Sequence, residues 1–471
     1  MTRILNIRSL IYVLFLNLFL SVRAEAAQED ISQKKLSYDL DISKKFISDK
    51  GGTPALLYWK DDFILSTPDE TFWMKIRGNL HMDTKFYREN NHNPSTIDIR
   101  RARIDLQGGF YQYITFRLQA EFADSPHLRN GWVDYGYRDW LHLRAGQMKP
   151  PFSTSWWTLD NNVNFIERGA GTPVYPFFDR GFWLWGELLS KTVTYNLSAW
   201  TGAGMETDYA KGDIDDHKDF IWRLFLQPFK FKKGVLGEKL YLCAQGSYGQ
   251  QSIPSSRFET KGYSAAIRDD KFWIWTANDN NAYVDINSRT RWGGEVHYIY
   301  GPASLSSEYL ITAYDDIFVL TAKNGNFVMA RDGEVASWSS WISYFITGEQ
   351  KQVSNWGWRQ PSPIHDFEPL NFKGPGAWEL LLRYTYTRTD SNLFDTIPTG
   401  GREYNILKGS PEIHEYTIGI NWTWNAMVRW QLNYVHIDSS DGILSGDKDS
   451  AKGQVWLKDE EMFALRMIFK L

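Results

Sequence analysis

Apolar and polar residues alternate without interruption over Phe72–Tyr87. The even positions carry mainly apolar side chains such as Met74 and Ile76, and the odd positions carry mainly polar ones such as Lys75 and Arg77. Successive side chains of a strand point to opposite faces, so this pattern predicts a strand with one apolar and one charged face. The stretch is longer than a usual strand of a soluble sheet and can cross a bilayer when tilted. It therefore predicts part of the wall of a transmembrane β-barrel.

Segments of the same kind follow to the C-terminus and predict an all-β chain. An even number of strands suits a closed antiparallel barrel with both termini on the periplasmic side. Short turns and long connections alternate between these segments, as in bacterial outer-membrane barrels. We predict sixteen strands, at 71–87, 96–108, 112–123, 129–137, 140–147, 179–188, 191–202, 218–228, 239–249, 289–300, 303–314, 335–348, 376–389, 412–424, 427–438 and 459–470.

Two connections depart from this simple scheme: residues 229–238, which form a somewhat longer turn, and residues 349–375. Residues 262–275 look strand-like, and we place them in a loop because counting them would make the number of strands odd. Residues 349–375 are long on the side where turns should be short. They indicate either a segment folded into the pore or a misassigned strand.

The N-terminal residues predict export. Arg3 and Arg8 precede an apolar run that ends at Val22, and Ala24–Ala26 offers a small-x-small cleavage site. This is the layout of a Sec signal peptide over residues 1–26, and the apolar run is shorter than the ~20 residues of a spanning helix. Residues 27–58 are polar and predict a periplasmic segment, and residues 59–471 form the barrel. We expect the protein in the outer membrane of a Gram-negative-type cell.

Composition limits the function classes. Aromatic residues make up 16% of the chain, which fits interfacial belts of a membrane barrel or an aromatic sugar-binding surface. The single cysteine, Cys243, excludes an intramolecular disulfide framework and thiolate metal clusters. The nine histidines show no ligand-like or catalytic spacing, so we expect no enzyme activity, cofactor or metal. The net charge of −4 gives no indication of nucleic-acid binding.

The polar faces of the predicted strands carry more cations than acids. A basic lining attracts anions and repels cations, and the arginine fork suits phosphate. Alternatively, the inward arginines pair with inward acids across strands and only brace the wall. The predicted pore-lining cations of the strands are Lys75, Arg77, Lys85, Arg101, Arg103, Arg117, Arg144, Arg223, Arg289, Arg291 and Arg383.

Several short motifs recur in a known family, and their order and spacing are more specific than any one of them. The chain resembles the phosphate-selective porin O and P family from about Trp59 to the C-terminus. The motifs are Trp59–Leu65, Lys75–Gly78, Ile99–Gly108, Leu143–Phe152, Tyr298–Leu305 with Glu308-Tyr309, Tyr344–Glu349, Gly376–Leu380 and Asn433–His436.

The resemblance implies a sixteen-stranded outer-membrane porin, usually a homotrimer, with a basic lumen narrowed by infolded loops. It implies that loop 148–178, with Lys149 and Arg168, forms the constriction, and that residues 349–375 contribute to it. It also implies pore arginines at Arg101, Arg103 and Arg180. The expected function is passive diffusion of small anions, with phosphate or polyphosphate as the solute.

A porin for sugars or other neutral solutes is the alternative. Aromatic side chains of loop 148–178 motivate it, because such rings stack on sugars. They are Trp156, Trp157, Tyr175, Phe177 and Phe178.

Overall fold

The computed structural model describes residues 55–59, 62–123, 126–171, 175–202, 216–250, 272–275, 283–320, 327–399, 402–446 and 452–471. The chain divides into two compact units, Met1–Leu57 and Tyr58–Leu471. The predicted signal peptide and most of the predicted periplasmic segment, residues 27–54, lie outside the described residues. The end of that segment begins a short strand, β1 (Leu56–Trp59).

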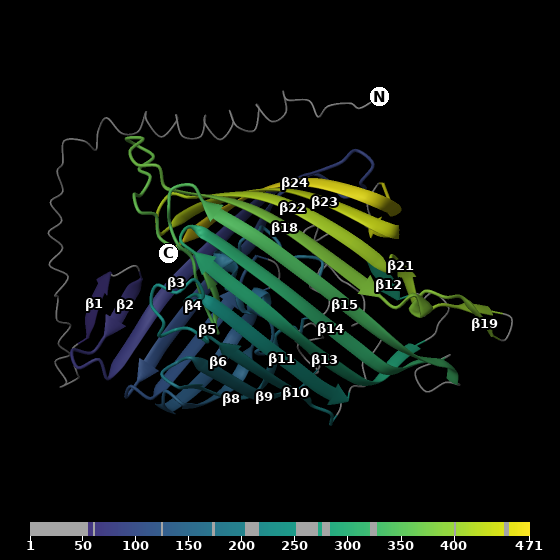
Figure 1. Cartoon of the computed structure of the whole chain (residues 1–471), viewed down its shortest axis with the longest axis horizontal. Coiled ribbons are helices and arrows are strands. Elements are labelled where there is room, and N and C mark those ends of the chain that lie inside the picture. Colours follow the sequence, from purple (N-terminus) through teal and green to yellow (C-terminus); the bar gives the residue numbers. More distant parts are fainter. Residues whose placement is uncertain are drawn as a thin grey trace. The chain divides into compact units, whose positions relative to one another are not determined.

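A closed antiparallel barrel of sixteen strands makes up the second unit (Figure 1), as predicted. Each strand pairs with the next along the chain, and the last pairs with the first, with Met462 opposite Tyr87 and Lys470 opposite Asn79. Closure leaves the sheet without a free edge, which a membrane requires. The strands are β3 (Phe72–Tyr87), β4 (Thr96–Phe110), β5 (Ile114–Glu121), β6 (His127–Arg138), β7 (Leu141–Met148), β8 (Asp179–Leu188), β9 (Val193–Trp200), β10 (Asp219–Leu226), β11 (Leu240–Gln250), β13 (Tyr283–Tyr300), β14 (Ala303–Leu320), β15 (Phe327–Phe345), β18 (Ala377–Thr389), β22 (Glu412–Thr423), β23 (Val428–Ser445) and β24 (Val455–Lys470).

A short additional strand extends the wall where the barrel closes. β2 (Phe63–Ser66) pairs with Trp73–Ile76 of β3, the part of β3 that precedes its pairing with β24. The backbone N–H groups of Gly78 and Leu471 each donate to the carbonyl of the other, at 3.1 and 2.9 Å. The C-terminus is thereby fixed against the first barrel strand.

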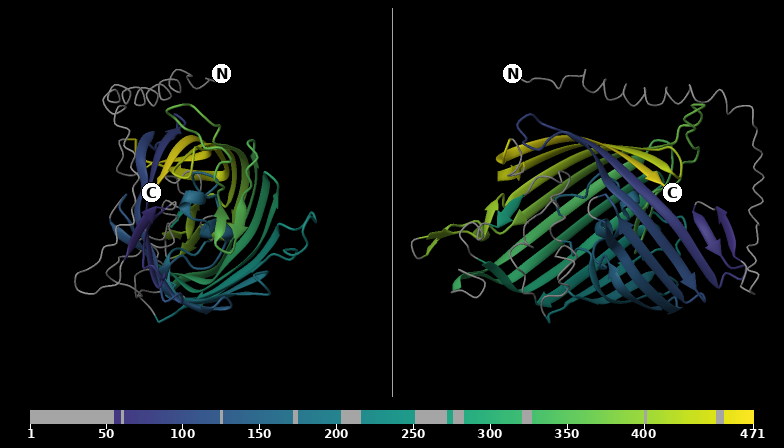
Figure 2. Two further views of the ribbon diagram at one scale, coloured as in Figure 1. Left: turned by 90° about the vertical axis from the view of Figure 1, so that its left-hand side faces the viewer. Right: turned by 180° about the vertical axis from the view of Figure 1, so that it is seen from behind.

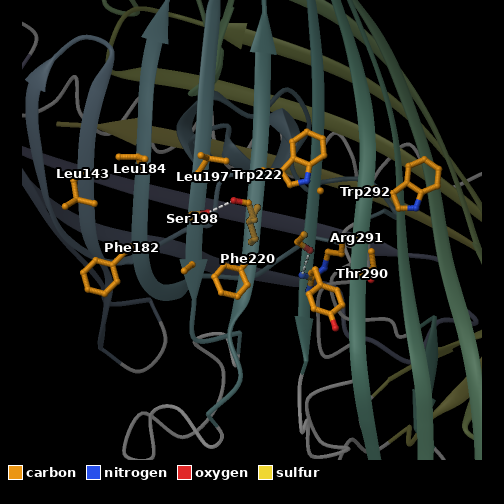
Figure 3. Close-up of a pocket in the computed structure, with 15 residues that line it drawn as sticks. Leu143, Phe182, Leu184, Leu197, Ser198, Phe220, Trp222, Thr290, Arg291 and Trp292 are labelled. Atoms are coloured by element: carbon orange, nitrogen blue, oxygen red, sulfur yellow. Dashed lines mark hydrogen bonds between the residues drawn. The ribbon is translucent and has the colours of Figure 1, made fainter.

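Alternation sorts the side chains between lipid and lumen. In β22, Tyr416 and Ile418 point outward with 48% and 53% of their surface exposed, whereas Glu415 and Thr417 are buried inside. Figure 3 shows one part of the outer face, an apolar groove whose lining includes Phe182 of β8, Phe220 and Trp222 of β10, and Trp292 of β13. This face is suited to lipid.

Several strands continue beyond the predicted ends on the side of the long connections. β13, β14, β15, β23 and β24 are each longer than the alternating apolar pattern indicated. Their extra residues include the exposed Asp316, Asp332 and Asp441. Hydrogen bonding between strands continues past the bilayer, where the outer face meets water and no longer needs apolar side chains. The hydrophobic pattern therefore ends before the strand does.

Short elements outside the barrel sheet occupy the long connections. β12 (Trp273–Trp275) pairs with β21 (Leu407–Gly409), and β19 (Ile397–Thr399) pairs with β20 (Arg402–Tyr404), after the 3-10 turn η6 (Ser391–Leu393). The prediction that 262–275 is not a wall strand is confirmed for Trp273–Trp275, and residues 262–271 lie outside the described residues. Among the described residues, no helix is long and apolar enough to span a membrane.

Two connections enter the barrel from opposite sides (Figure 2). The constriction loop, residues 149–178, follows β7 and contains α2 (Thr154–Trp157) and the 3-10 turn η2 (Asp160–Asn162). The connection after β15 contains a hairpin of β16 (Gln352–Ser354) and β17 (Gly357–Arg359). Of the two interpretations of residues 349–375, the one with a segment folded into the pore is confirmed.

Candidate functional site at the constriction

The constriction loop is fastened to the inner wall at both ends. The backbone N–H of Thr154 donates to both carboxylate oxygens of Glu295 on β13, at 3.1 and 2.9 Å. The hydroxyls of Ser153 and Tyr175 both donate to Glu308 on β14, that of Tyr175 at 2.6 Å. A single wall carboxylate thus holds residues from both ends of the loop.

The hairpin of β16 and β17 contacts the middle of the constriction loop. The N–H of Trp358 donates to Thr158 Oγ1 at 3.0 Å, and Lys351 Nζ donates to Asn164 Oδ1 at 2.6 Å and forms an ion pair with Glu379 of β18. At Gly357, φ is 100° and a Cβ would lie 2.6 Å from Thr158 Cα, so only glycine fits. The loop and the hairpin form one packed unit across the lumen.

Asp160 of η2 is the acid around which the inner cations gather. Its carboxylate accepts from Arg103 Nη1 at 2.5 Å and from Arg168 Nη2 at 3.1 Å, and it lies 3.3 Å from Arg101 Nε. Burial alone would raise the pKa of Asp160, but Arg101, Arg103, Lys149 and Arg168 together hold it well below its ordinary value. Asp160 is therefore a fixed negative charge shared by several cations.

A β-bulge in β4 turns Arg100 into the lumen beside Arg101. The register of β3 with β4 shifts after His81, where Arg100 has no residue opposite it. Such an extra residue re-aims a side chain that alternation would send to the other face. Arg100 Nε donates to Glu167 of the constriction loop at 2.9 Å.

A second bulge, in β6, does the same for Arg129. In the neighbouring strand β5, Gln119 lies opposite Asn130 and the next residue, Ala120, lies opposite Leu128. Arg129 therefore has no residue opposite it. The Arg129 guanidinium lies 4.1 Å from the centre of the Phe178 ring, and its Nε is buried without a hydrogen-bond partner. Within the described part of the chain, Arg129 forms no ion pair with a carboxylate.

Lys149 lies next to Arg129 and also lacks a carboxylate partner among the described residues. Its Nζ donates to the Trp156 carbonyl at 2.7 Å and lies 4.5 Å from the Trp156 ring centre and 5.5 Å from that of Phe178. Burial lowers the pKa of Lys149 well below its ordinary value, and the nearby Arg168 lowers it further. An anion between Lys149 and Arg129 would favour the charged form of Lys149 and so offset the effects of burial and of Arg168 on its pKa.

The predicted cations of the wall strands β5 and β7 form separate pairs with acids of the preceding strands, β4 and β6. Arg117 donates to Asp105 at 2.6 Å, and Arg144 donates to Asp134 at 2.8 Å. Arg144 also lies over the Trp132 ring at 3.9 Å. These two arginines brace the wall.

Other predicted pore cations are also near acids. Lys75 and Arg77 share Asp62, with both Arg77 contacts at 2.7 Å and the Lys75 contact at 3.6 Å. Arg289 and Arg291 share Asp219, at 2.6 and 3.3 Å.

Three further predicted cations are buried inside the barrel. Arg223 lies 3.4 Å from Glu295, and Arg383 donates to Glu415 at 2.7 Å. Lys85 is also buried.

One small cluster has the composition of a metal site but not its electrostatics. Cys243, Glu295 and His297 meet inside the wall, with His297 Nε2 3.0 Å from Glu295 and 3.8 Å from the Cys243 sulfur. Arg223 already supplies the cation there, and Thr154 occupies the remaining contacts of Glu295. The cluster serves to hold the constriction loop.

The aromatic side chains of the constriction loop pack on one another. Trp156 and Phe178 are buried, and Trp156 contacts the rings of Tyr175 and Phe177 at 5.8 and 5.6 Å between centres. Trp157 packs on Trp183 of the wall, at 5.1 Å. These rings form an interior core that positions the cations.

The sequence profile of phosphate-selective porins O and P matches residues 74–211 and 274–471. The chain belongs to this family. No curated protein sequence matches it. Membership of this family and the barrel together identify an outer-membrane channel for small solutes.

Solved porin structures share the fold. The outer-membrane-expressed OmpT of Vibrio cholerae aligns with a TM-score of 0.50 and 11% identity, over 85% of this chain and 98% of that one. An anion-selective porin from Comamonas acidovorans also gives 0.50 and 11%, over 85% of this chain and all of that one (100%). At such identities these similarities establish the fold alone.

One predicted pore residue of this porin lies on the wrong face. Arg180 shares the outward face of β8 with Phe182, which is 65% exposed, whereas Asp179 and Trp183 point inward and are buried. Arg180 is exposed and donates to Gln147, its outward neighbour on β7, at 3.2 Å. The family resemblance placed it in the pore, but alternation from Phe182 excludes this.

Strict alternation does not predict Arg100 and Arg129 inside the lumen, because each of them is the extra residue of a bulge. In β4 the outward residues change from the odd positions Ile97 and Ile99 to the even positions Ile104 and Leu106. This change of parity was visible in the sequence and indicates a bulge between them. The acids Asp160 and Glu167 gave no comparable signal, because a loop's path through the lumen has no periodicity.

Proposed function

We propose that this outer-membrane channel favours small anions, with phosphate or polyphosphate as the candidate solute. The observation that carries the proposal is the pair Arg129 and Lys149, two adjacent cations, the first partly buried and the second buried, with no carboxylate of their own in the described structure. A buried charge without a partner is costly, so the pair attracts a mobile counter-ion. The family's description and the anion-selective relative from Comamonas acidovorans agree with this.

The other cations of the constriction set how tightly an anion is held. Arg101, Arg103 and Arg168 face the same region but already share Asp160. A passing phosphate competes with Asp160 for their donors, so it binds without being trapped. Conduction requires such weak, multiple contacts.

Of the predicted pore residues, we assign anion contact to Lys149, Arg168, Arg101 and Arg103, together with Arg129. We assign bracing of the wall and of the loop to the predicted cations that pair with acids and do not contact Asp160. They are Lys75, Arg77, Arg117, Arg144, Arg223, Arg289, Arg291 and Arg383.

We further infer passive conduction without catalysis, cofactor or metal, export through the signal peptide at residues 1–26, and assembly as a homotrimer. Cross-linking and mass measurement in detergent test the trimer. The sugar alternative has less support, because Trp156 and Phe178 are buried in the loop's own core.

The test is the reversal potential of the protein in a planar bilayer under a KCl gradient, followed by titration of the current with phosphate and with a maltooligosaccharide. We expect an anion-favouring potential and block by phosphate. A zero or cation-favouring potential would contradict the proposal, and block by the sugar alone would support the alternative.

Matched variants locate the effect. Arg129→Ala and Lys149→Ala should each weaken phosphate block. Arg180→Ala, which removes one arginine from the outer face, should leave block and selectivity unchanged. Equal effects of all three would mean that the constriction pair is not the anion site.

A further inference from the structure

The connection that follows the hairpin of β16 and β17 leaves the barrel and bends outward over its periplasmic rim. We call residues 361–376 the rim loop. Its light green trace projects beyond the wall near the left ends of β18 and β22 in Figure 1, and the two views of Figure 2 agree. This rim carries the short turns and the C-terminus, so it is the periplasmic one.

The base of the rim loop is held firmly. The carbonyl of Pro375 accepts from the indole N–H groups of Trp378 and Trp422, each at 2.9 Å, and the N–H of Phe367 donates to the Trp424 carbonyl at 2.7 Å. The Phe367 ring lies 4.8 Å from that of Trp422 and 5.2 Å from that of Trp424. The loop is thus joined to outward-facing tryptophans of the wall.

The tip of the rim loop presents large apolar side chains to the surroundings. Leu370 is 74% exposed and Phe372 is 82% exposed, and Ile364 nearby is 59% exposed. The tip is closed by a backbone hydrogen bond, in which the N–H of Glu368 donates to the carbonyl of Lys373 at 2.8 Å.

The backbone of the tip is strained at Phe372, its most exposed side chain. Its φ is 49°, in the left-handed region that bulky side chains rarely adopt. Gly374, with φ of 72°, lets the chain turn back after Phe372. Only glycine fits there, because a Cβ would lie 1.9 Å from the Asp366 carbonyl oxygen. Strain of this kind at an exposed site points to a function of the exposed side chain.

We propose that Leu370 and Phe372 insert into the periplasmic leaflet of the outer membrane and anchor the rim loop there. The tip continues the outward aromatic surface of Trp378, Trp422 and Phe367, which borders the bilayer. Aromatic and aliphatic side chains at this level suit the membrane–water interface. The occupant of the tip is therefore lipid, and the anchored loop fixes the hairpin that it connects to inside the pore.

The test places a fluorophore at the tip without removing the apolar residues. Full-length Asn371→Cys is labelled with an environment-sensitive dye and reconstituted in phosphatidylethanolamine–phosphatidylglycerol vesicles with or without brominated acyl chains. We expect strong quenching by the brominated chains. Native protein is the blank, because its cysteine, Cys243, is buried.

Two reference positions and one variant make the outcome decisive. Ile418→Cys, on the lipid face, should be quenched to a similar degree, and Lys458→Cys, at the opposite end of the barrel, should not. Adding Leu370→Ser and Phe372→Ser to Asn371→Cys should abolish the quenching.

Two results would overturn the proposal. A tip fluorophore that behaves like the one at Lys458→Cys means exposure to water. A short-wavelength emission without bromine quenching means that a second copy or another protein covers the tip. Neither result depends on ion selectivity, so the proposal stands or falls independently of the proposed function.

Discussion

The arginines of the wall and those of the constriction point into the same lumen but differ in how their charge is balanced. On the wall, Arg117 has Asp105 and Arg144 has Asp134. At the constriction, Arg101, Arg103 and Arg168 share Asp160, and Arg103 also pairs with Glu121 at 2.6 Å. The direction in which an arginine points is therefore a poor guide to whether it acts on a passing anion. The number of arginines that share one acid is a better guide.

Asp160→Asn should have the largest effect, because several cations lose their shared counter-charge at once. Breaking a buried ion pair costs about 3–5 kcal/mol, and here more than one pair is lost. We expect a lower temperature at which the folded barrel converts to the unfolded band on cold SDS gels. We also expect tighter phosphate block in planar bilayers, and looser block would contradict the shared-acid description.

Arg144→Ala should destabilise the barrel by about 3–5 kcal/mol, since it removes the arginine from the buried Asp134, whose other partners are His142 and Trp185, and also removes the contact with Trp132. Chemical denaturation in detergent measures this. Because Arg144 belongs to a separate pair, the reversal potential should stay close to that of the native protein. A large shift in selectivity would mean that wall pairs also act on anions.

Arg129→Ala should affect function more than stability. A charge-assisted contact is worth about 1.5–3 kcal/mol, so phosphate block should weaken by roughly tenfold or more. The thermal midpoint should change little, since no ion pair of the described structure is broken. Arg129→Lys keeps the charge and should retain part of the block, which separates charge from ring packing.

Lys351 gives a smaller, pH-dependent effect. Burial lowers its pKa from 10.5 to about 8, although Glu379 acts in the opposite direction. Between about pH 8 and pH 10.5 the unfolded chain therefore holds a proton that the folded one has released, so this residue's contribution to stability rises with pH. The difference in unfolding free energy between native protein and Lys351→Met should change over that window, and a difference constant across it would contradict the shift.

The wall of this porin was predictable because lipid imposes a strict period of two. Strand 179–188 was predicted with its observed ends, Asp179–Leu188, since its outward face carries Phe182, Leu184 and Leu188 at alternate positions up to its end. β13 was predicted too short, because residues before position 289 extend beyond the bilayer and no longer show the pattern.

The constriction was predictable only in part. Inward cations such as Arg101 and Arg103 follow from alternation, and Arg100 could have followed from the change of parity in β4. Asp160 could not, because its role depends on a loop crossing the lumen to meet distant strands. Arg180 is the opposite case, because the family resemblance predicts a pore position and the pattern of its own strand predicts an outward one.

The contact between Thr158 and Trp358 limits how this chain can change in length. Surface connections ordinarily tolerate insertions and deletions. Here a connection from the extracellular side and one from the periplasmic side touch inside the pore, 200 residues apart in the chain, with room only for glycine at Gly357. A residue added to either one displaces the other, so the two segments must change together.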